Sequence, residues 1–411
     1  MARRIIPLVV IFFFASVAWI ILGGSTEYRT RSQDSKLKRQ VGQLWGTVQR
    51  QEAPRAFYRT NVIKELETIE NSETVIRRIK ETSDHNVTLD SSNMVVDLQL
   101  KHRRKGLLWY STYRVEFSGL YLLKNNTGEE AEFHFAYYFP SKDGLYDDFA
   151  IKMDGARISE FSPDSGKVDI EMNMKPGEFR SIEITYGSQG MDEWWYAFGS
   201  GVSQIKNLDF TMTTDFDEID FPENSIAPTD KVKEGKGWKL SWKYDNLISG
   251  IQIGMDMPDK LNPGPFASRV SFFAPVSLFL FFFLVFIITT VKGIRIHPMN
   301  YFFVAAAFFS FHLLVAYLAD HIDIYAAFGI SSAVSIFLVV SYMRLVTGIR
   351  FALVETGIAQ FVYLVLFSYA FFLEGITGLS ITIACIITLF VVMQLTGRVD
   401  WDKQFERQKS G

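Results

Sequence analysis

Long apolar runs at both ends of the chain define its predicted membrane-spanning segments. The first run covers residues 5–22 and is prolonged by Gly23 and Gly24. Five further runs fill the carboxy-terminal third, at residues 271–291, 298–319, 324–343, 351–373 and 376–396. Each of these five can cross about 30 Å of hydrocarbon, and the first run is nearly long enough. Because lipid cannot hydrogen-bond the backbone, we predict that all six runs are helices.

The amino-terminal run follows Met-Ala-Arg-Arg and is longer than the apolar core of a cleaved signal peptide. A signal peptide would also show a small-x-small cleavage site after that core. We therefore favour an uncleaved signal anchor, with cleavage as the alternative.

Residues 25–270 lie between the first two apolar runs and begin with two stretches that we predict to be helical. Leu37, Val41, Leu44 and Val48 recur at i, i+4, i+7 and i+11, which places them on one face of a helix. The polar stretch at residues 61–82 is predicted to form a second helix.

From Met94 onward the hydrophobic period changes to two, which is typical of half-buried β-strands. The alternation is clear at residues 94–100, 113–117, 133–137, 168–172, 182–186, 208–212 and 238–244. Turn sequences such as Asn126-Thr127-Gly128 and Asp154-Gly155 separate these runs. Many short amphipathic strands at this spacing favour an antiparallel sandwich.

The predicted fold class is therefore a membrane protein with six transmembrane α-helices, one N-terminal and five C-terminal. A large inserted extracytoplasmic domain, mainly β and sandwich-like, is preceded by helical segments. The predicted domains are a signal anchor at 1–24, this external domain at 25–270, a five-helix bundle at 271–397 and a cytoplasmic tail at 398–411.

Basic residues flank the predicted spans on one side only. That side carries Arg3, Arg4, Lys292, Arg295, Arg344, Arg350, Arg398, Lys403, Arg407 and Lys409. The short loops of the other side carry Asp320, Asp323 and Glu374 and no Lys or Arg. By the positive-inside rule, both termini are cytoplasmic and residues 25–270 lie outside the cytoplasm. The expected location is the bacterial inner membrane, so the lipid bilayer is one partner.

The overall charge excludes a basic nucleic-acid binder, because 42 Lys and Arg against 45 Asp and Glu give a net charge of -3. The chain contains no HExxH, GxSxG, P-loop or Gly-rich dinucleotide motif. Its single cysteine, Cys385, cannot form an intramolecular disulfide, and its six histidines show no metal-ligand spacing. We therefore predict no catalytic, cofactor-binding or metal-binding residue, although a catalytic set assembled from distant positions leaves no such signature.

Three segments of the external domain have alternative interpretations. The acidic run at residues 215–220 is either a cation site or, as we favour, a solvated strand end. The basic turn at residues 101–106 either attracts anionic lipid or envelope polymers or is an exposed hairpin tip, which we favour. Trp194, Trp195 and Tyr196 either line a binding groove or pack in the core, the more common arrangement.

Ionisable residues in or beside the spans are the other functional candidates, because burying charge in a bilayer is costly. They are His312, Glu355, Glu374 and Asp320. His312 and Glu355 are compatible with a proton or ligand path, but a structural hydrogen bond and an interfacial carboxylate are the favoured roles.

Several motifs resemble the CreD family of bacterial inner-membrane proteins. They are His297-Pro298-Met299-Asn300-Tyr301, the segment 393–401, Gly106-Leu107-Leu108-Trp109-Tyr110 and the segment 260–265. In the first of these, Pro298 suits the first helical position, while His297, Asn300 and Tyr301 suit the headgroup level. The resemblance covers nearly the whole chain and implies a link to envelope stress and to a sensor-kinase regulon, with no established enzymatic activity.

Two functions follow from these observations. The favoured one is a non-enzymatic envelope-stress protein whose external domain senses or binds a periplasmic ligand or envelope proteins. The alternative is a transporter or lipid-handling protein that uses the helical bundle.

Overall fold

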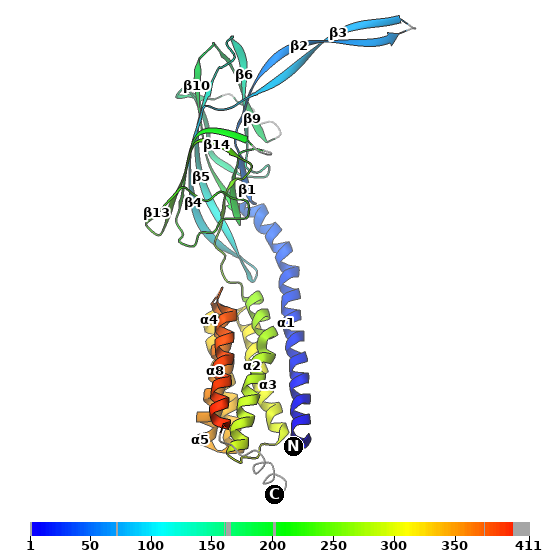
Figure 1. Cartoon of the computed structure of the whole chain (residues 1–411), viewed down its shortest axis with the longest axis vertical. Helices are drawn as coiled ribbons and strands as arrows, with labels where there is room; N and C mark the ends of the chain where they lie inside the picture. Colours follow the sequence, from blue (N-terminus) through cyan, green and yellow to red (C-terminus); the bar gives the residue numbers. More distant parts are fainter. Residues whose placement is uncertain are drawn as a thin grey trace. The chain divides into compact units, whose positions relative to one another are not determined.

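The computed structural model describes residues 2–70, 73–159, 161, 166–199, 203–373 and 375–397. The chain forms two compact units (Figure 1), one made of residues 1–36 and 261–411 and the other of residues 37–260. We refer to them as the membrane unit and the β unit.

The predicted six membrane-spanning helices are confirmed, since six helices of the described residues are long and apolar enough to cross a bilayer. Four of them are α2 (Pro263–Val291), α3 (Pro298–Leu318), α4 (Ile324–Thr347) and α8 (Thr377–Thr396). The amino-terminal span belongs to α1 (Ala2–Trp45). The remaining span, Ile349–Phe372, is built from α5 (Ile349–Phe351), η1 (Ala352–Thr356), α6 (Gly357–Gln360), η2 (Phe361–Leu366), α7 (Phe367–Tyr369) and η3 (Ala370–Phe372).

Local sequence sets where these helices begin and end. Pro263 and Pro298 occupy the first helical positions of α2 and α3, where the missing N–H costs no hydrogen bond. Asp323 caps α4 and accepts a hydrogen bond from the backbone N–H of Tyr325 at 2.9 Å. Gly348 ends α4 with a φ of 88°, a conformation that favours glycine.

Helix α1 is longer than the sequence indicated, because the signal anchor and the amphipathic stretch form one continuous helix of 44 residues. The helix ends at Trp45, so Val48 lies beyond it. In the β unit, Leu37, Val41 and Trp45 pack against Leu108, Tyr110 and Met191. The predicted face is therefore only partly correct: Leu37 and Val41 pack, whereas Leu44 is exposed. The periodicity also did not predict the continuity of the helix.

The β unit contains three sheets. An eight-stranded sheet has the order β13-β14-β12-β4-β5-β10-β7-β8, a four-stranded sheet the order β3-β2-β6-β9, and a three-stranded sheet the order β1-β11-β15. The strands are β1 (Gln49–Glu52), β2 (Arg55–Glu70), β3 (Glu73–Val87), β4 (Ser91–Lys105), β5 (Leu108–Lys124), β6 (Ala131–Tyr138), β7 (Tyr146–Met153), β8 (Ala156–Ile158), β9 (Lys167–Met174), β10 (Phe179–Met191), β11 (Glu193–Ala197), β12 (Ser203–Thr214), β13 (Asp230–Glu234), β14 (Gly237–Ser249) and β15 (Ile253–Asp256). Most neighbouring strands are antiparallel, but β4 pairs with β12 and β1 with β11 in parallel.

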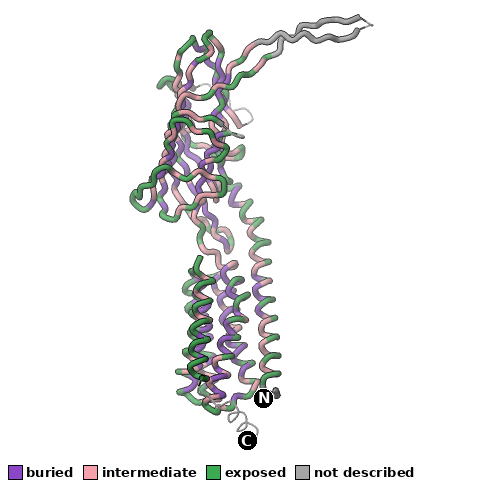
Figure 2. Tube along the Cα trace, viewed as in Figure 1, coloured by how far each residue is buried: buried purple, intermediate pink, exposed green. Residues whose placement is uncertain are grey.

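The predicted mainly-β, sandwich-like architecture is confirmed, because the inward faces of the sheets enclose one apolar core (Figure 2). Tyr121 of β5 meets Phe135 of β6 with ring centroids 5.7 Å apart, which joins the eight-stranded to the four-stranded sheet. Phe210 of β12 and Trp242 of β14 are fully buried in the same core.

The predicted helix at residues 61–82 is wrong. This stretch belongs to the hairpin of β2 and β3, which pair antiparallel from Ala56 opposite Val87 to Glu70 opposite Glu73. The segment is rich in β-branched residues, including Val62, Ile63 and Ile69, and these favour extended backbone over helix. The many charges of the stretch concealed this preference.

Candidate functional site

A groove of about 680 Å³ opens in the β unit and is its best candidate for a binding site. Its walls come from the link between β1 and β2, the link between β3 and β4, and the start of β12. This volume lies within the range of about 300–1,000 Å³ typical of small-molecule sites.

The groove combines an apolar floor with a charged rim. Tyr196 and Leu208 form part of the lining and are almost completely buried. Glu52, Arg55 and Lys206 supply both signs of charge to the lining. The Arg55 side chain is held in place, because its Nε donates a hydrogen bond to Asn86 Oδ1 at 2.7 Å. Such a lining suits a ligand that has an apolar body and polar or charged groups.

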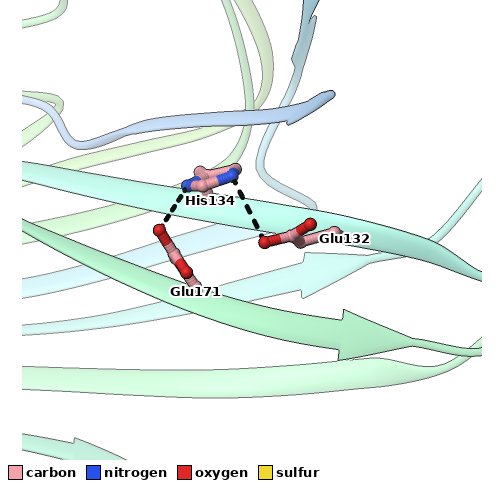
Figure 3. Close-up of side chains that lie close together, drawn as sticks. All are labelled: Glu132, His134 and Glu171. Carbon is pink, nitrogen blue, oxygen red and sulfur yellow. Dashed lines mark ion pairs between the residues drawn. The ribbon is translucent and has the colours of Figure 1, made fainter. Parts of the chain in front are cut away.

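A histidine surrounded by carboxylates lies on the four-stranded sheet (Figure 3). His134 of β6 is directly opposite Glu171 of β9, and Glu132 and Asp169 stand on the same strands two residues away. His134 Nδ1 is 3.4 Å from Asp169 Oδ1 and 3.8 Å from Glu171 Oε1, while Nε2 is 4.0 Å from Glu132 Oε1. The histidine side chain is 1% exposed, and neither ring nitrogen has a hydrogen-bond partner among the described residues.

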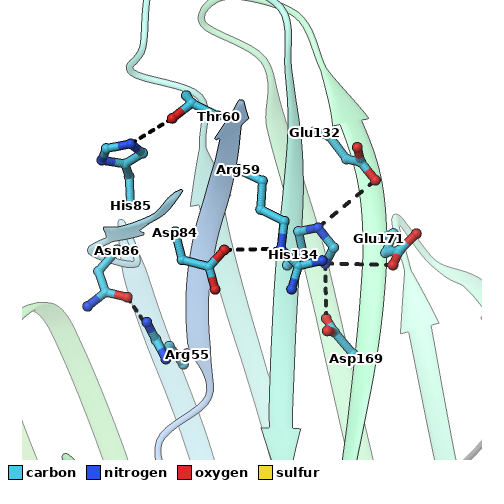
Figure 4. Close-up of polar contacts among 10 residues, drawn as sticks. All are labelled: Arg55, Arg59, Thr60, Asp84, His85, Asn86, Glu132, His134, Asp169 and Glu171. Atoms are coloured by element: carbon cyan, nitrogen blue, oxygen red, sulfur yellow. Dashed lines mark hydrogen bonds and ion pairs between the residues drawn. The ribbon is translucent and has the colours of Figure 1, made fainter. Parts of the chain in front are cut away.

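Strand β2 completes the surroundings of this histidine (Figure 4). The ring of Phe57 stacks on the imidazole of His134 at a centroid distance of 4.9 Å and an interplanar angle of 6°. The guanidinium groups of Arg55 and Arg59 lie 5.2 and 5.3 Å from the Phe57 ring. Arg59 is also paired with Asp84 at 3.0 Å, so its charge is matched by β3.

The acidic run at residues 215–220 does not converge on one point. Asp215 accepts a hydrogen bond from the Leu100 backbone N–H at 2.8 Å. Asp217 pairs with Lys233 at 2.5 Å, and this hydrogen bond lowers the pKa of the Asp217 carboxyl. Asp220 contributes its backbone to a bridge with Asp256. These contacts serve strand ends, in keeping with the favoured interpretation of the run.

Asp256, which forms the bridge with Asp220, has a carboxyl whose pKa is shifted in the opposite direction from that of Asp217. Burial raises its pKa to about 6, with further contributions from the negative charges of Glu193, Asp220 and Asp259. Glu193 is its direct cross-strand neighbour on β11. The sequence indicated no such cluster, because its members come from separate strands and loops.

The basic turn and the aromatic cluster have structural contacts. In the turn, the guanidinium of Arg103 lies 3.3 Å from the ring centroid of Trp45, and His102 Nε2 is 2.9 Å from the backbone oxygen of Pro258. Trp194 and Trp195 are buried in β11. Tyr196 is buried as well but also lines the groove, so this cluster contributes both to the core and to the candidate site.

In the membrane unit, the structure does not bring His312 and Glu355 into contact with each other. His312 is 2% exposed, its Nδ1 lies 3.0 Å from the Phe308 backbone oxygen, and Trp19 packs edge-on against its ring. Glu355 pairs with Lys292. Asp320 pairs with Arg29 of α1 at 3.1 Å. Glu374 lies outside the described residues.

The motif at the start of α3 makes contacts with the protein. His297 caps the helix by accepting a hydrogen bond from the Met299 N–H at 3.2 Å, next to Pro298. Asn300 Oδ1 accepts a hydrogen bond from the Tyr342 hydroxyl at 2.8 Å. Tyr301 is buried and packs edge-on against Phe282 at 5.2 Å.

Sequence reasoning missed a row of buried polar side chains in the fifth span. Gln360 Nε2 donates a hydrogen bond to Ser335 Oγ of α4 at 2.9 Å. Gln360 Oε1, Thr356 Oγ1 and Ser368 Oγ are buried without a hydrogen-bond partner among the described residues. The signal was present in the sequence, since Thr356, Gln360 and Ser368 are separated by multiples of four in an otherwise apolar run.

These features define a multi-pass membrane protein with a mainly-β unit inserted between its first and second membrane helices. Residues 206–402 match the family model described as "Inner membrane protein CreD". This part of the chain is therefore similar to the CreD family, which supports the resemblance that its motifs indicated. No curated protein matches the chain.

Solved structures show only distant similarity. A Legionella pneumophila protein described as nutrient-binding shares 10% identity at a TM-score of 0.31, over 57% of this chain and 76% of that one. An M1 zinc metallopeptidase from Deinococcus radiodurans shares 9% identity at a TM-score of 0.23, over 41% and 42% of the two chains. Neither similarity supports a conclusion about fold or function.

Proposed function

We propose that this CreD-like protein is a non-enzymatic receptor of the bacterial inner membrane that acts in the response to envelope stress. In this proposal the β unit lies outside the cytoplasm and binds a ligand, and the membrane unit anchors it. The groove between the β1–β2 link and β12 is the observation that carries the proposal.

The orientation rests on the distribution of charge around the spans. The basic residues gather on the side of Lys292 and Arg344, whereas the short loops of the other side carry Asp320 and Asp323. Long domains cross the membrane largely regardless of their own charge, so the charges of the β unit do not oppose this orientation.

Reporter fusions test this orientation. Fusions at Gly128 and Asp320 should report the outside, and fusions at Gly293, Thr347 and Gly411 should report the cytoplasm. Protease added to spheroplasts should cut within the β unit and leave the carboxy-terminal tail intact. A cytoplasmic signal from the Gly128 fusion would overturn the orientation together with the receptor proposal.

The ligand we expect is a small amphipathic envelope component or peptide. An apolar body would cover Val87, Leu89 and Ile205, which line the groove and are only partly buried. Its polar or anionic groups would reach Arg55 and Lys206. Charged contacts at a partly exposed rim set specificity and association rate more than affinity.

Photo-crosslinking in living cells tests the groove. A photoreactive amino acid at Ile205, which lines the groove, should give a covalent adduct that increases under envelope stress. The same amino acid at Val232, an exposed position of β13, is the matched control. The double substitution R55E and K206E should reduce the adduct at Ile205 and cause the same stress sensitivity as deletion of the protein. Equal adducts at both positions, or a double variant that behaves as wild type, would refute the proposal.

A second candidate function is movement of protons or a small solute through the membrane unit. The observation that favours it is the row of Thr356, Gln360 and Ser368 beside the π-helical segments η1 and η2. Within the described part of the chain, each of the three keeps a buried oxygen without a hydrogen-bond partner. Such segments occur frequently at functional sites. His312 and Glu355, the residues indicated by the sequence, lie in separate contacts.

Flux measurements in liposomes test this second candidate. The reconstituted protein should pass protons or solute, and Q360L should reduce the rate at least tenfold. S341A, at a half-buried position of α4 whose hydroxyl bonds only the Leu338 carbonyl of its own helix, should leave the rate unchanged. Absence of flux in the wild type, together with normal behaviour of H312A and E355A in cells, would exclude transport.

A further inference from the structure

We propose that His134, Asp169 and Glu171 form a binding site for a divalent transition-metal ion on the four-stranded sheet of the β unit. This site goes beyond the proposed ligand groove and does not depend on it. Its starting point is a buried imidazole with no hydrogen-bond partner among the described residues, surrounded by three carboxylates.

The distances from His134 Nδ1 to the two carboxylates match those around a small cation. A tetrahedral zinc ion with bonds of about 2.1 Å separates its ligand atoms by about 3.4 Å. His134 Nδ1 stands 3.4 Å from Asp169 Oδ1 and 3.8 Å from Glu171 Oε1. Rotation of the Asp169 and Glu171 side chains is needed to bring both oxygens onto one ion at His134 Nδ1, whereas Glu132, His134 and Glu171 already place one donor atom each within 4.8 Å of one another.

Charge at the site also favours a cation. Among the described residues, neither Glu132, Asp169 nor Glu171 forms an ion pair with Lys or Arg. Carboxylates gathered without a cation repel one another, and a divalent ion relieves this repulsion.

The second nitrogen of the ring fits the same assignment. Metal-binding histidines commonly direct their other N–H toward a carboxylate, which fixes the ring and increases its basicity. His134 Nε2 faces Glu132 at 4.0 Å, and Phe57 stacks on the ring and limits its rotation. Glu132 would therefore position the ring from the side of Nε2.

The donor set selects the class of metal. Ca²⁺ and Mg²⁺ prefer an all-oxygen environment, whereas imidazole suits zinc, copper, iron and nickel. The side chains of Asp169 and Glu171 are 29% and 64% exposed, so the ion would keep at least one position for water or for a ligand from solution. With one histidine and two carboxylates as its protein ligands, the ion would therefore have a coordination position left for a molecule from solution.

Zinc binding to the full-length protein tests the proposal. The protein would be purified in nanodiscs with an affinity tag that contains no histidine, stripped with EDTA and titrated with Zn²⁺ at pH 7.5. We expect one tight equivalent in the wild type. D169N and E171Q should each weaken it at least tenfold, and E132Q about ten- to hundredfold, as for loss of an outer carboxylate. E130Q, at an exposed position beside β6, is the matched control and should bind as the wild type does.

A spectroscopic measurement tests the histidine directly without replacing this buried residue. Cu²⁺ added in place of Zn²⁺ should give an EPR spectrum with coupling to one imidazole nitrogen, and D169N should lose that signal. Zinc binding that is unchanged in D169N and E171Q would refute the site. Absence of a tight zinc equivalent in the wild type would also refute it.

Discussion

Replacement of Asp256 by asparagine is expected to stabilise the β unit at neutral pH. The Asp256 carboxyl lies at the end of β15, opposite Glu193, and shares its surroundings with Asp220 and Asp259. No Lys or Arg pairs with it among the described residues. The ionised carboxylate of Asp256 is therefore less stable in the folded protein than in the unfolded chain.

The magnitude follows from the pKa of Asp256, which is raised from 3.8 to about 6. Between these two values the folded protein binds more protons than the unfolded chain, so the free energy of unfolding falls as the pH rises from about 4 to about 6. Without screening, the loss above that window would be about 3 kcal/mol. Because the side chain is partly exposed, screening by solvent reduces it to about 1 kcal/mol.

Thermal unfolding of the full-length protein measures this effect. In a domain of this size, about 1 kcal/mol corresponds to a Tm change of about 2–4 °C. D256N should unfold at a higher temperature than the wild type at pH 7.5, and the difference should vanish near pH 3.8, where both side chains are uncharged. Tryptophan fluorescence reports on the β unit, whose core contains Trp194 and Trp242.

The matched control is D217N. Asp217 belongs to the same acidic region, but its hydrogen bond to Lys233 lowers the pKa of its carboxyl. Its charge is therefore favourable in the folded protein, and D217N should not raise the Tm at pH 7.5. A destabilised D256N at pH 7.5, or an equal gain at pH 7.5 and pH 3.8, would refute the electrostatic reasoning.

Two further substitutions test packing in the β unit. G46A should lower the Tm far more than G128A. Both glycines have positive φ, but only at Gly46 would an added Cβ come within 2.1 Å of another backbone atom, the Gln189 oxygen. Equal Tm changes in thermal scans would contradict this. F210A should cost about 3–5 kcal/mol, because the Phe210 ring is fully buried between Tyr196 and Trp242. A loss below about 1 kcal/mol in denaturant titrations would show that the core tolerates the cavity.

Alternation predicted those strands that have one buried and one wet face. Strand β9 is the clearest case, since its burial alternates along the whole of Lys167–Met174. Strand β11 was missed because four of its five residues are buried, so both faces are apolar and no alternation remains. Strand β13 was missed for the opposite reason, because all of its residues are exposed at a sheet edge.

The cluster around His134 could not be predicted for a different reason. Glu132 and His134 share one face of β6, and Asp169 and Glu171 share one face of β9, and both spacings are readable in the sequence. Their proximity depends on the pairing of β6 with β9, two strands that are separated by β7 and β8 in the chain. Nothing in the sequence fixes that pairing, so the four residues remained unconnected.

The charged residues of the membrane unit are better explained as pairs than as a relay. Asp320 pairs with Arg29 of α1, and Glu355 pairs with Lys292, the residue that follows α2, so each carboxylate has a basic partner from another part of the membrane unit. A buried charge in a bilayer is costly unless it is neutralised, and pairing between helices meets that requirement while fixing their alignment. No carboxylate of the described residues contacts His312, whose contacts are the Phe308 carbonyl and the rings of Trp19 and Phe311. Polar groups available for a path therefore lie along the fifth span, where Gln360 and Thr356 keep unpaired oxygens, and not at the ionisable residues that the sequence brings to notice first.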